Sequence, residues 1–364
     1  MYIKEIKLKN FRNYEEKELF FNKKVNLILG RNGQGKTNLI ESIYISSIGK
    51  SFRTNRDNEM IKFGKDFAKI SAEVIKENNE TLVEIILNKD LKKFIKVDGI
   101  KIRKISELLN NVLVVIFSPE DLRIVKDEPE KRRKFIDKEL CQIKPSYYEN
   151  LYNYKKVLVQ RNSYLKEEKI DTSVLDIWDT QLAFFGSHVI IQREIFSKKL
   201  KQISSVIHSN ITGNKEKLDV KYCPNITFNE EIKEQERIFY NILKKSFNND
   251  IRQRTTSRGP HKDDFDFYIN NINVRNFGSQ GQQRTTALSL KLAEIDIIKK
   301  ETGEKPILLL DDVMSELDLE RQEFLLKSLS EVQLFLTTTE LPEKLINKFT
   351  DCKIFNVEKG EITE

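Results

Sequence analysis

The sequence contains the stretch Gly30-Arg31-Asn32-Gly33-Gln34-Gly35-Lys36-Thr37, which matches the phosphate-binding loop pattern Gly-x-x-x-x-Gly-Lys-Ser/Thr. An apolar strand predicted at 25–29 precedes the loop and a helix predicted over 38–48 follows it, which is the setting that the pattern requires. Glycines let successive backbone N–H groups converge on phosphate oxygens, and the start of the helix adds positive potential. The stretch therefore predicts an α/β nucleotide-binding fold. A glycine-rich turn that only happens to precede a helix is the disfavoured alternative.

The loop assigns chemistry to its last two residues. We expect Lys36 to reach the β and γ phosphates and the Thr37 hydroxyl to ligate Mg²⁺. A second anchor follows the apolar run 307–310, where Asp311 and Asp312 stand at the end of a predicted strand, the edge at which ligands bind in such sheets. Asp311 is the predicted metal ligand, and Asp312 is predicted to orient or deprotonate the attacking water. A solvated loop or a helix cap is the alternative for this acidic pair.

A third candidate opens the helix predicted over 282–301. Ser279, Gly281 and Gln282 present a hydroxyl, a glycine backbone and a helix N-terminus together, a group suited to bind a γ-phosphate. Taken alone, an ordinary helix start capped by Ser279 is the favoured interpretation.

Composition excludes several classes of protein. The chain has 364 residues, of which 39% are hydrophobic and 33% charged, so it can bury a sizeable core. Its longest apolar run, 112–117, is far shorter than the roughly 18 to 20 residues that cross a bilayer, and residues 1–6 do not resemble a secretory signal. Three widely separated cysteines favour neither a disulfide framework nor a zinc site. We expect a cytoplasmic protein with no membrane contact.

Apolar periodicity divides the chain into strand-rich and helical parts. Hairpins are predicted over 68–86, 94–102 and 265–274, further strands at 334–336 and 353–357 with a helix before each, and long helices over 128–208. We therefore predict an ATPase domain formed by residues 1–125 and 212–364, interrupted by a helical domain over 126–211. The predicted fold class is α/β: a mixed sheet around the loop helix, antiparallel hairpins, and an inserted all-helical second domain.

Basic residues gather in three clusters that could contact nucleic-acid phosphates. The net charge of +7 gives only a mild preference for polyanions, and any one cluster taken alone is better explained as a solvated face. The predicted DNA contacts are Lys50, Arg53, Arg56, Arg132 and Arg133. A third cluster comprises Arg252, Arg254, Arg258 and Lys262.

Several short motifs, in order along essentially the whole chain, resemble the RecF family of bacterial recombination mediators. Besides the phosphate loop, these motifs are Leu8-Lys9-Asn10-Phe11-Arg12-Asn13-Tyr14, Gly49-Lys50-Ser51-Phe52-Arg53, Phe117-Ser118-Pro119-Glu120-Asp121-Leu122, Arg132-Arg133 with Phe135-Ile136-Asp137, Gly259-Pro260-His261-Lys262-Asp263-Asp264, Leu310-Asp311-Asp312-Val313 and Ser315-Glu316-Leu317-Asp318. The resemblance implies a head of the ABC ATPase type, related to SMC and double-strand-break repair ATPases, that acts in recombinational gap repair.

The resemblance also implies partners and a site built by two chains. A homodimer would enclose two ATP molecules with Mg²⁺, hydrolyse them slowly, bind duplex DNA or single-strand/duplex junctions, and help to load recombinase with RecR and RecO. The phosphate loop of one copy would face Ser279 of the other, with 315–318 at the same seam. Loop pattern and resemblance together give a nucleotide-contacting set of Arg12, Gly30, Arg31, Asn32, Gly33, Gln34, Gly35, Lys36, Thr37, Asn38, Ser279, Gly281, Gln282 and Thr338.

Two departures from the family pattern leave alternatives open. ABC enzymes usually place Glu where this chain has Asp312, and Thr337-Thr338-Thr339 stands where many transporters have a histidine; Thr338 is our candidate sensor of the γ-phosphate. The competing classes are a structural DNA scaffold with an inert nucleotide site, the ATPase subunit of a transporter, and the head of a longer coiled-coil ATPase. The inserted helical block disfavours the second class, and the absence of sustained heptads disfavours the third.

Overall fold

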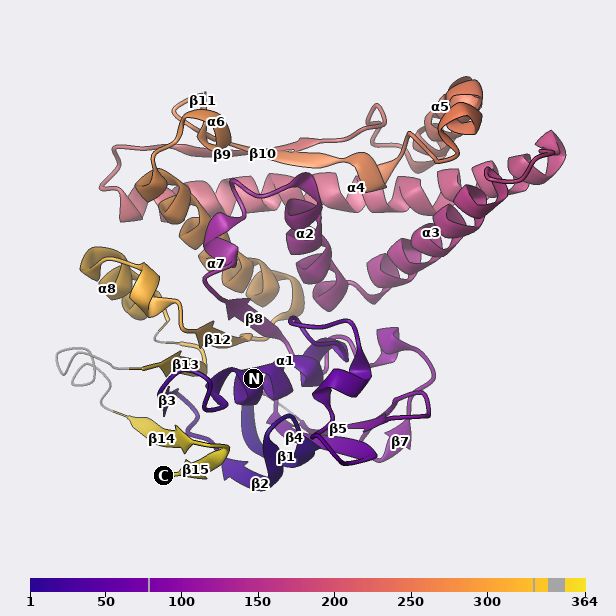
Figure 1. Cartoon of the computed structure of the whole chain (residues 1–364). Coiled ribbons are helices and arrows are strands. Elements are labelled where there is room, and N and C mark those ends of the chain that lie inside the picture. The colour runs from indigo at the N-terminus through magenta and orange to yellow at the C-terminus, as the bar shows by residue number, and fades with distance from the viewer. Residues whose placement is uncertain (78, 330, 340–350) are drawn as a thin grey trace. The chain divides into compact units, whose positions relative to one another are not determined.

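The computed structural model describes residues 1–77, 79–329, 331–339 and 351–364 (Figure 1). The chain forms two compact units. Unit 1 comprises Met1–Leu122 and Lys291–Glu364, and unit 2 comprises Arg123–Leu290. Among the described residues, every helix is too short or too polar to cross a lipid bilayer.

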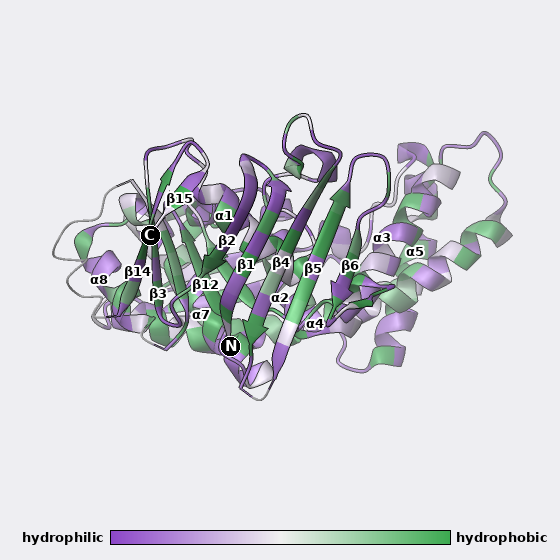
Figure 2. Ribbon diagram, turned by 90° about the horizontal axis from the view of Figure 1, so that it is seen from below, coloured by the Kyte–Doolittle hydropathy of each residue, from purple (hydrophilic) through white to green (hydrophobic). Residues whose placement is uncertain are grey.

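Unit 1 contains an antiparallel sheet in the order β2-β1-β4-β5-β6-β7, whose strands lie side by side in Figure 2. Along β4 and β5 every second residue is buried, so one face packs on the core and the other faces solvent. The sheet includes two of the predicted hairpins, which are confirmed. Its strands are β1 (Tyr2–Phe11), β2 (Tyr14–Phe20), β4 (Phe67–Ile75), β5 (Glu80–Asn88), β6 (Phe94–Val97) and β7 (Ile100–Lys101).

The second sheet of unit 1 has the order β15-β14-β3-β13-β12-β8, and all its pairs except β14–β15 are parallel. Helix α1 (Lys36–Ile48) belongs with residues of both sheets to one apolar core. Because β13 lies between β3 and β12, the C-terminal ends of these strands meet at one edge. The strands are β3 (Val25–Leu29), β8 (Val114–Phe117), β12 (Ile307–Asp311), β13 (Leu334–Thr338), β14 (Cys352–Glu358) and β15 (Glu361–Thr363).

The remaining elements of unit 1 are short or shared. Helix α8 (Leu319–Ser328) precedes β13 as predicted, whereas the helix predicted before 353 lies outside the described residues. Helix α7 (Gln280–Thr302) begins in unit 2 and ends in unit 1. Four 3₁₀ turns complete the unit's described elements: Asp57–Met60, Ile105–Glu107, Asp121–Arg123, which reaches the boundary with unit 2, and Met314–Glu316.

Unit 2 combines the predicted helices with a small sheet in the order β11-β10-β9. Residues 126–211 are largely helical, as expected. The compact unit continues to Leu290, however, because α4 packs against α5 and β9 as well as α3, so the predicted boundary at 211/212 differs from the structure. The elements are α2 (Pro129–Ile143), α3 (Pro145–Tyr164), α4 (Thr172–Ile211), β9 (Leu218–Cys223), α5 (Ile232–Gln253), a 3₁₀ turn (Pro260–Lys262), β10 (Asp264–Ile269), β11 (Ile272–Asn273) and α6 (Val274–Phe277).

Candidate functional site

The phosphate loop of unit 1 joins β3 to α1, and its backbone needs glycine at two close approaches. Gly30 has a φ of +155°, and a Cβ there would lie 2.3 Å from the carbonyl oxygen of Val357. Gly35 has a φ of +124°, and its Cβ would lie 2.6 Å from Nδ2 of Asn13. No other residue fits either position without moving backbone or a neighbouring amide. The strand, loop and helix predicted from the sequence are therefore confirmed.

Residues from both ends of the chain hold the loop in place by hydrogen bonds to its carbonyl oxygens. Asn13 Nδ2 donates a 2.9 Å hydrogen bond to the carbonyl of Gln34, and the Tyr14 hydroxyl donates a 2.9 Å bond to that of Gly35. The backbone N–H of Gly360 also donates to the Gln34 carbonyl, at 3.1 Å. Burial raises the pKa of Tyr14, which keeps its hydroxyl a donor. Sequence reasoning did not assign these supporting roles, although Asn13 and Tyr14 stand in the first motif.

Lys36 is a buried cation that forms no salt bridge with a carboxylate of the described residues. Its side chain is 6% exposed, and its Nζ donates to the carbonyl oxygens of Gly30 at 2.6 Å and Arg31 at 3.1 Å. Burial lowers the pKa of Lys36, although the negative charges of Asp312 and Asp311 oppose that shift. An ammonium group held only by carbonyl oxygens gains a stronger, charge-assisted partner when a phosphate arrives.

Hard oxygen donors meet where β12 ends beside the start of α1. The Thr37 hydroxyl lies 3.1 Å from Asp311 Oδ1, and the Thr337 hydroxyl lies 2.7 Å from the same oxygen. Burial raises the pKa of Asp311, and no basic side chain forms a salt bridge with it among the described residues. A carboxylate and a hydroxyl without a countercharge fit Mg²⁺, which prefers oxygen ligands and keeps several waters or phosphate oxygens. The described residues contain no cluster of three or more His, Cys, Asp or Glu side chains that could hold a metal by itself.

Asp312 adopts a left-handed backbone conformation with φ +55°, which turns the chain after β12. Its backbone N–H donates to the Thr337 hydroxyl at 2.9 Å, so Thr337 holds both carboxylate residues in place. Sequence reasoning missed Thr337 and selected Thr338, which is 4% exposed. Thr338 as γ-phosphate sensor stays a prediction. The run of three threonines indicated that a hydroxyl could lie at this site. Which of the hydroxyls faces Asp311 depends on the pairing of β13 with β12.

A fully buried carboxylate, Glu41 on α1, organises the basic residues beside the loop. Arg12 binds it with two hydrogen bonds, Nε to Oε2 at 2.8 Å and Nη2 to Oε1 at 2.6 Å. Arg53 Nη1 lies 3.3 Å from Glu41 Oε2 and 2.8 Å from Asn38 Oδ1. Arg53, predicted as a DNA contact, is thus tied to the loop helix together with Arg12 and Asn38. Glu41 was not predicted.

The Ser279 segment belongs to unit 2. The Ser279 hydroxyl accepts from the backbone N–H of Gln282 at 3.2 Å, and Gln282 Oε1 accepts from the N–H of Ser279 at 2.9 Å, which together form a capping box. Ser279 is exposed. Gln282 Nε2 donates to Glu216 at 2.8 Å, and Glu216 in turn contacts the buried His208 at 3.1 Å. The predicted helix start is confirmed. The Ser279 hydroxyl lies at the surface, and hydrogen bonds with Gln282 hold it in place.

The predicted DNA-contacting residues have different surroundings. Arg132 is 1% exposed and binds both carboxylate oxygens of Asp264, at 2.7 and 2.8 Å, so its prediction as a DNA contact does not fit the structure: the side chain has no free surface. Arg133 is half-buried and donates to the carbonyl of Asp263 at 2.6 Å. Lys50 and Arg56 are exposed, and Arg56 lies 3.6 Å from Glu59.

Comparison with known proteins identifies relatives over the full chain. The family model described as "RecF/RecN/SMC N terminal domain" matches residues 2–363. The "DNA replication and repair protein RecF" of Clostridioides difficile is 48% identical over 100% of this chain and 98% of that protein. The protein of the same name from Clostridium tetani is 47% identical over 100% of both chains.

Solved structures give the same result. A structure described as "the recombination mediator protein RecF-ATP in RecFOR pathway" has a TM-score of 0.90 and 39% identity, and covers 100% of this chain and 97% of the other. Its counterpart with "ATPrS" has a TM-score of 0.92 and 39% identity, with coverage of 99% and 97%. An Smc head domain from Pyrococcus furiosus, at 17% identity and a TM-score of 0.55, shares the fold alone and covers 100% of this chain and 95% of its own.

Proposed function

The chain belongs to the RecF family, within the RecF/RecN/SMC group, and from this premise we propose that it is an ATP-dependent DNA-binding protein of recombinational gap repair. It binds ATP with Mg²⁺, forms a homodimer when ATP is bound, and hydrolyses the nucleotide slowly. In the dimer it binds duplex DNA or single-strand/duplex junctions and helps to load recombinase. Its protein partner is RecR, acting with RecO.

One observation carries the nucleotide part of the proposal: a buried cation and a buried carboxylate, both outside any salt bridge, lie in the same site. Among the described residues, Lys36 donates to loop carbonyls alone, and the Asp311 carboxylate accepts from hydroxyls alone. Leaving buried charges uncompensated costs free energy, and proteins retain such an arrangement where a ligand supplies the missing charge. The γ-phosphate supplies negative charge to Lys36, and Mg²⁺ supplies positive charge to Asp311.

The residues of unit 1 divide the chemistry among them. The backbone N–H groups of the loop and the start of α1 bind the phosphates. Thr37 and Asp311 would hold Mg²⁺, which neutralises phosphate charge when bound. Asp312, turned by its left-handed backbone, would accept a proton from the attacking water. Its side chain is one methylene shorter than the usual glutamate, which favours slow turnover. Slow hydrolysis suits a switch, in which ATP shifts the population toward the closed dimer.

The two-chain site follows from the exposure of Ser279 and from the family resemblance. A capped helix start at the surface, with a hydroxyl and the Gly281 backbone, is suited to meet a phosphate that another chain carries. ATP would then act as an interfacial ligand, and its hydrolysis would remove the contact that favours closure.

Complementation between two inactive variants tests the proposal. Lys36→Arg removes the fitted ammonium group of the loop, whereas Ser279→Arg blocks the helix start and leaves the loop intact. Each variant alone should fail to dimerise with ATP in sedimentation and should release no phosphate above background. Mixed in equal amounts, they should form heterodimers that contain one intact composite site, with phosphate release restored to a measurable fraction of wild type.

Three outcomes contradict parts of the proposal. Lys36→Arg dimers that are as strong as wild-type dimers, and equally strong with and without ATP, would reject ATP as the interfacial ligand. A mixture as inactive as its components would reject the site shared by two chains. No phosphate release from the wild-type protein under any condition would favour the inert scaffold, and a failure to bind duplex DNA in any nucleotide state would favour a transporter subunit.

A further inference from the structure

We propose that a basic hollow on the β6–β7 hairpin of unit 1 is a duplex-DNA contact surface that binds the phosphate backbone. The inference rests on the proposed function and names a surface that the basic clusters singled out in the sequence do not include. The hollow is lined by Lys92, Lys93, Phe94, Ile95, Lys101, Ile102, Arg103, Lys104 and Ile105.

Charge is concentrated around this hairpin. Residues 89–104 contain seven basic and two acidic residues, a net charge of +5, whereas the whole 364-residue chain has a net charge of +7. This short segment therefore carries most of the chain's excess positive charge. Fields from like charges add, so a polyanion encounters its strongest attraction where the cations are densest.

The hollow has a volume of about 660 Å³ and is lined by five cations without a carboxylate among the described lining residues. Lys92 and Arg103 are exposed, and their side chains take part in no salt bridge of the described chain. Lys101 lies over the Phe94 ring, 5.1 Å from its centroid, a contact that positions the ammonium without neutralising it. Lys92, Lys101 and Arg103 are therefore available to an external anion.

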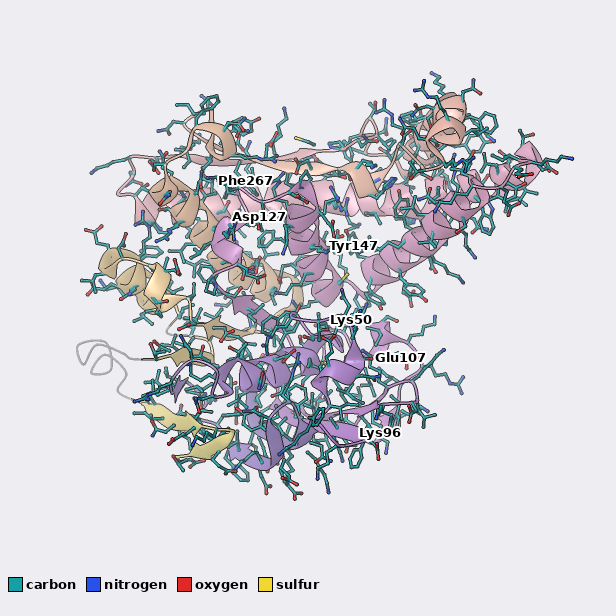
Figure 3. The ribbon with its side chains drawn as sticks, viewed as in Figure 1. Lys50, Lys96, Glu107, Asp127, Tyr147 and Phe267 are labelled. Carbon is teal, nitrogen blue, oxygen red and sulfur yellow. The ribbon has the colours of Figure 1, made fainter. Side chains whose placement is uncertain are left out.

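The hairpin is anchored to the loop helix. Lys93 Nζ donates to the carbonyl of Gly49, the residue that caps α1, at 2.8 Å, and lies 3.0 Å from Asp57 Oδ1. Lys93 thus holds the hairpin to α1, whereas Lys92, Lys101 and Arg103 are exposed to solvent. Lys96, labelled in Figure 3, lies on the solvent face of β6 opposite Glu84, and Glu84 is already bound to Lys69 at 2.6 Å. The Lys93 side chain thus joins the hairpin to the C-terminal end of α1.

Protection of a sheet edge explains only part of this charge. Strand β7 is the last strand of its sheet, and lysines on edge strands prevent pairing with another copy. That role accounts for Lys101. It does not account for Lys92, Arg103 and Lys104, which lie outside both strands of the hairpin. Cations that extend past the ends of the strands are suited to bind the repeating phosphate charges of a nucleic-acid backbone.

The test compares two triple variants of the full-length protein. The hollow variant carries Lys92→Gln, Lys101→Gln and Arg103→Gln. The control variant carries Lys7→Gln, Lys62→Gln and Lys69→Gln, which removes the same charge from unit 1 at positions already paired with Glu18, Glu15 and Glu84. The affinity for a gapped duplex is measured with ATP at several salt concentrations, and thermal melting verifies folding.

We expect the dissociation constant of the hollow variant to rise at least about tenfold, and the slope of log affinity against log salt to fall by about 2 to 3. The control variant should stay within about twofold of wild type. Equal affinities and slopes for the two variants would overturn the inference and leave the proposed function intact, provided that the wild type binds DNA. If wild type fails to bind DNA, the proposed function itself fails. Displacement of DNA by polyglutamate at equal charge concentration would also overturn it, because it would indicate an acidic protein as the occupant.

Discussion

Buried charges at the phosphate loop of unit 1 and in the core of unit 2 have opposite meanings. In the described part of unit 1, Lys36 and Asp311 are buried without a salt bridge, and both lie at the phosphate loop. In unit 2, Arg161 and Arg193 are fully buried, and each binds two carboxylate residues. A compensated charge supports the fold, whereas an uncompensated one indicates a ligand. Burial alone does not distinguish a structural charge from a functional one. The presence or absence of an oppositely charged side chain beside it does.

The largest expected effect concerns a compensated charge. Arg161 donates to Asp179 and Asp250 at 2.8 Å each, and joins α3 to α4 and α5. Arg161→Met removes the buried cation that Asp179 and Asp250 share, leaves Asp250 without a salt bridge among the described residues, and should destabilise unit 2 by about 3 to 5 kcal/mol. Hydrogen exchange of the α3–α5 amides, with thermal melting, measures the loss.

The matched change in unit 1 is Lys36→Met, which removes an uncompensated charge. It should change the stability of the nucleotide-free protein by less than about 1 kcal/mol, because the released loop carbonyls can bind water. Similar losses of stability for the two variants would show that burial, and not compensation, sets the cost.

The next prediction concerns the chemistry of unit 1. Asp312→Asn keeps the size of the side chain but removes the proton acceptor, so phosphate release should fall by about a hundredfold to a thousandfold. ATP-dependent dimerisation in sedimentation should persist, because the phosphate contacts remain. Asp312→Glu, which restores the residue usual in ABC enzymes, is the control and should retain activity. Unchanged turnover in Asp312→Asn would remove Asp312 from the mechanism.

The sequence predicted the parts of this site that are continuous in the chain. The loop 30–37 carries its own strand, turn and helix, so the pattern sufficed to place Lys36 and Thr37. Asp311 followed from an apolar strand and an acidic end. Thr337 could not be predicted in the same way, because its role depends on strand order, and pairing between strands distant in sequence leaves no local signal.

The error at Arg132 has a different cause. The prediction of Arg132 as a DNA contact rests on the composition of the run 131–134, which is entirely basic. The helix pattern already contained the correction: Arg132 shares the buried face of α2 with Phe135, Ile136 and Glu139, at helical spacing. The domain boundary predicted at 211/212 lies inside unit 2. A change from helix to strand suggests a new domain, whereas the packing of β9 on α4 keeps both in one unit.

A substitution with a smaller expected effect tests whether Ser279 of unit 2 only caps α7 or also contacts a ligand. Ser279→Ala removes the hydroxyl that caps α7 and should cost about 1 kcal/mol. Asp171→Ala is the control, because Asp171 caps α4 and accepts from the N–H of Ser173 at 2.8 Å. Both variants should lose comparable stability in melting experiments. Only Ser279→Ala should also weaken ATP-dependent dimerisation; equal dimerisation in the two variants would reduce Ser279 to a cap.

The smallest expected effect tests the uncompensated carboxylate itself. Burial raises the pKa of Asp311 above its ordinary value of 3.8. Between the pKa of the unfolded state and the raised pKa of the folded state, the folded protein therefore binds more protons than the unfolded protein. The contribution of Asp311 to stability falls as pH rises through that range. Asp311→Asn should remove this dependence and make the nucleotide-free protein slightly more stable at neutral pH, because no buried charge remains at this position.

The same substitution should abolish Mg²⁺-dependent ATP hydrolysis, so stability and function should change in opposite directions. Melting of wild type and Asp311→Asn between pH 4 and 7, without nucleotide, measures the first effect, and phosphate release with and without Mg²⁺ measures the second. A less stable Asp311→Asn at neutral pH would mean that Thr37 and Thr337 fully compensate the carboxylate. The contrast between the two units would then fail at its central residue, because Asp311 would be a structural charge like those that bind Arg161.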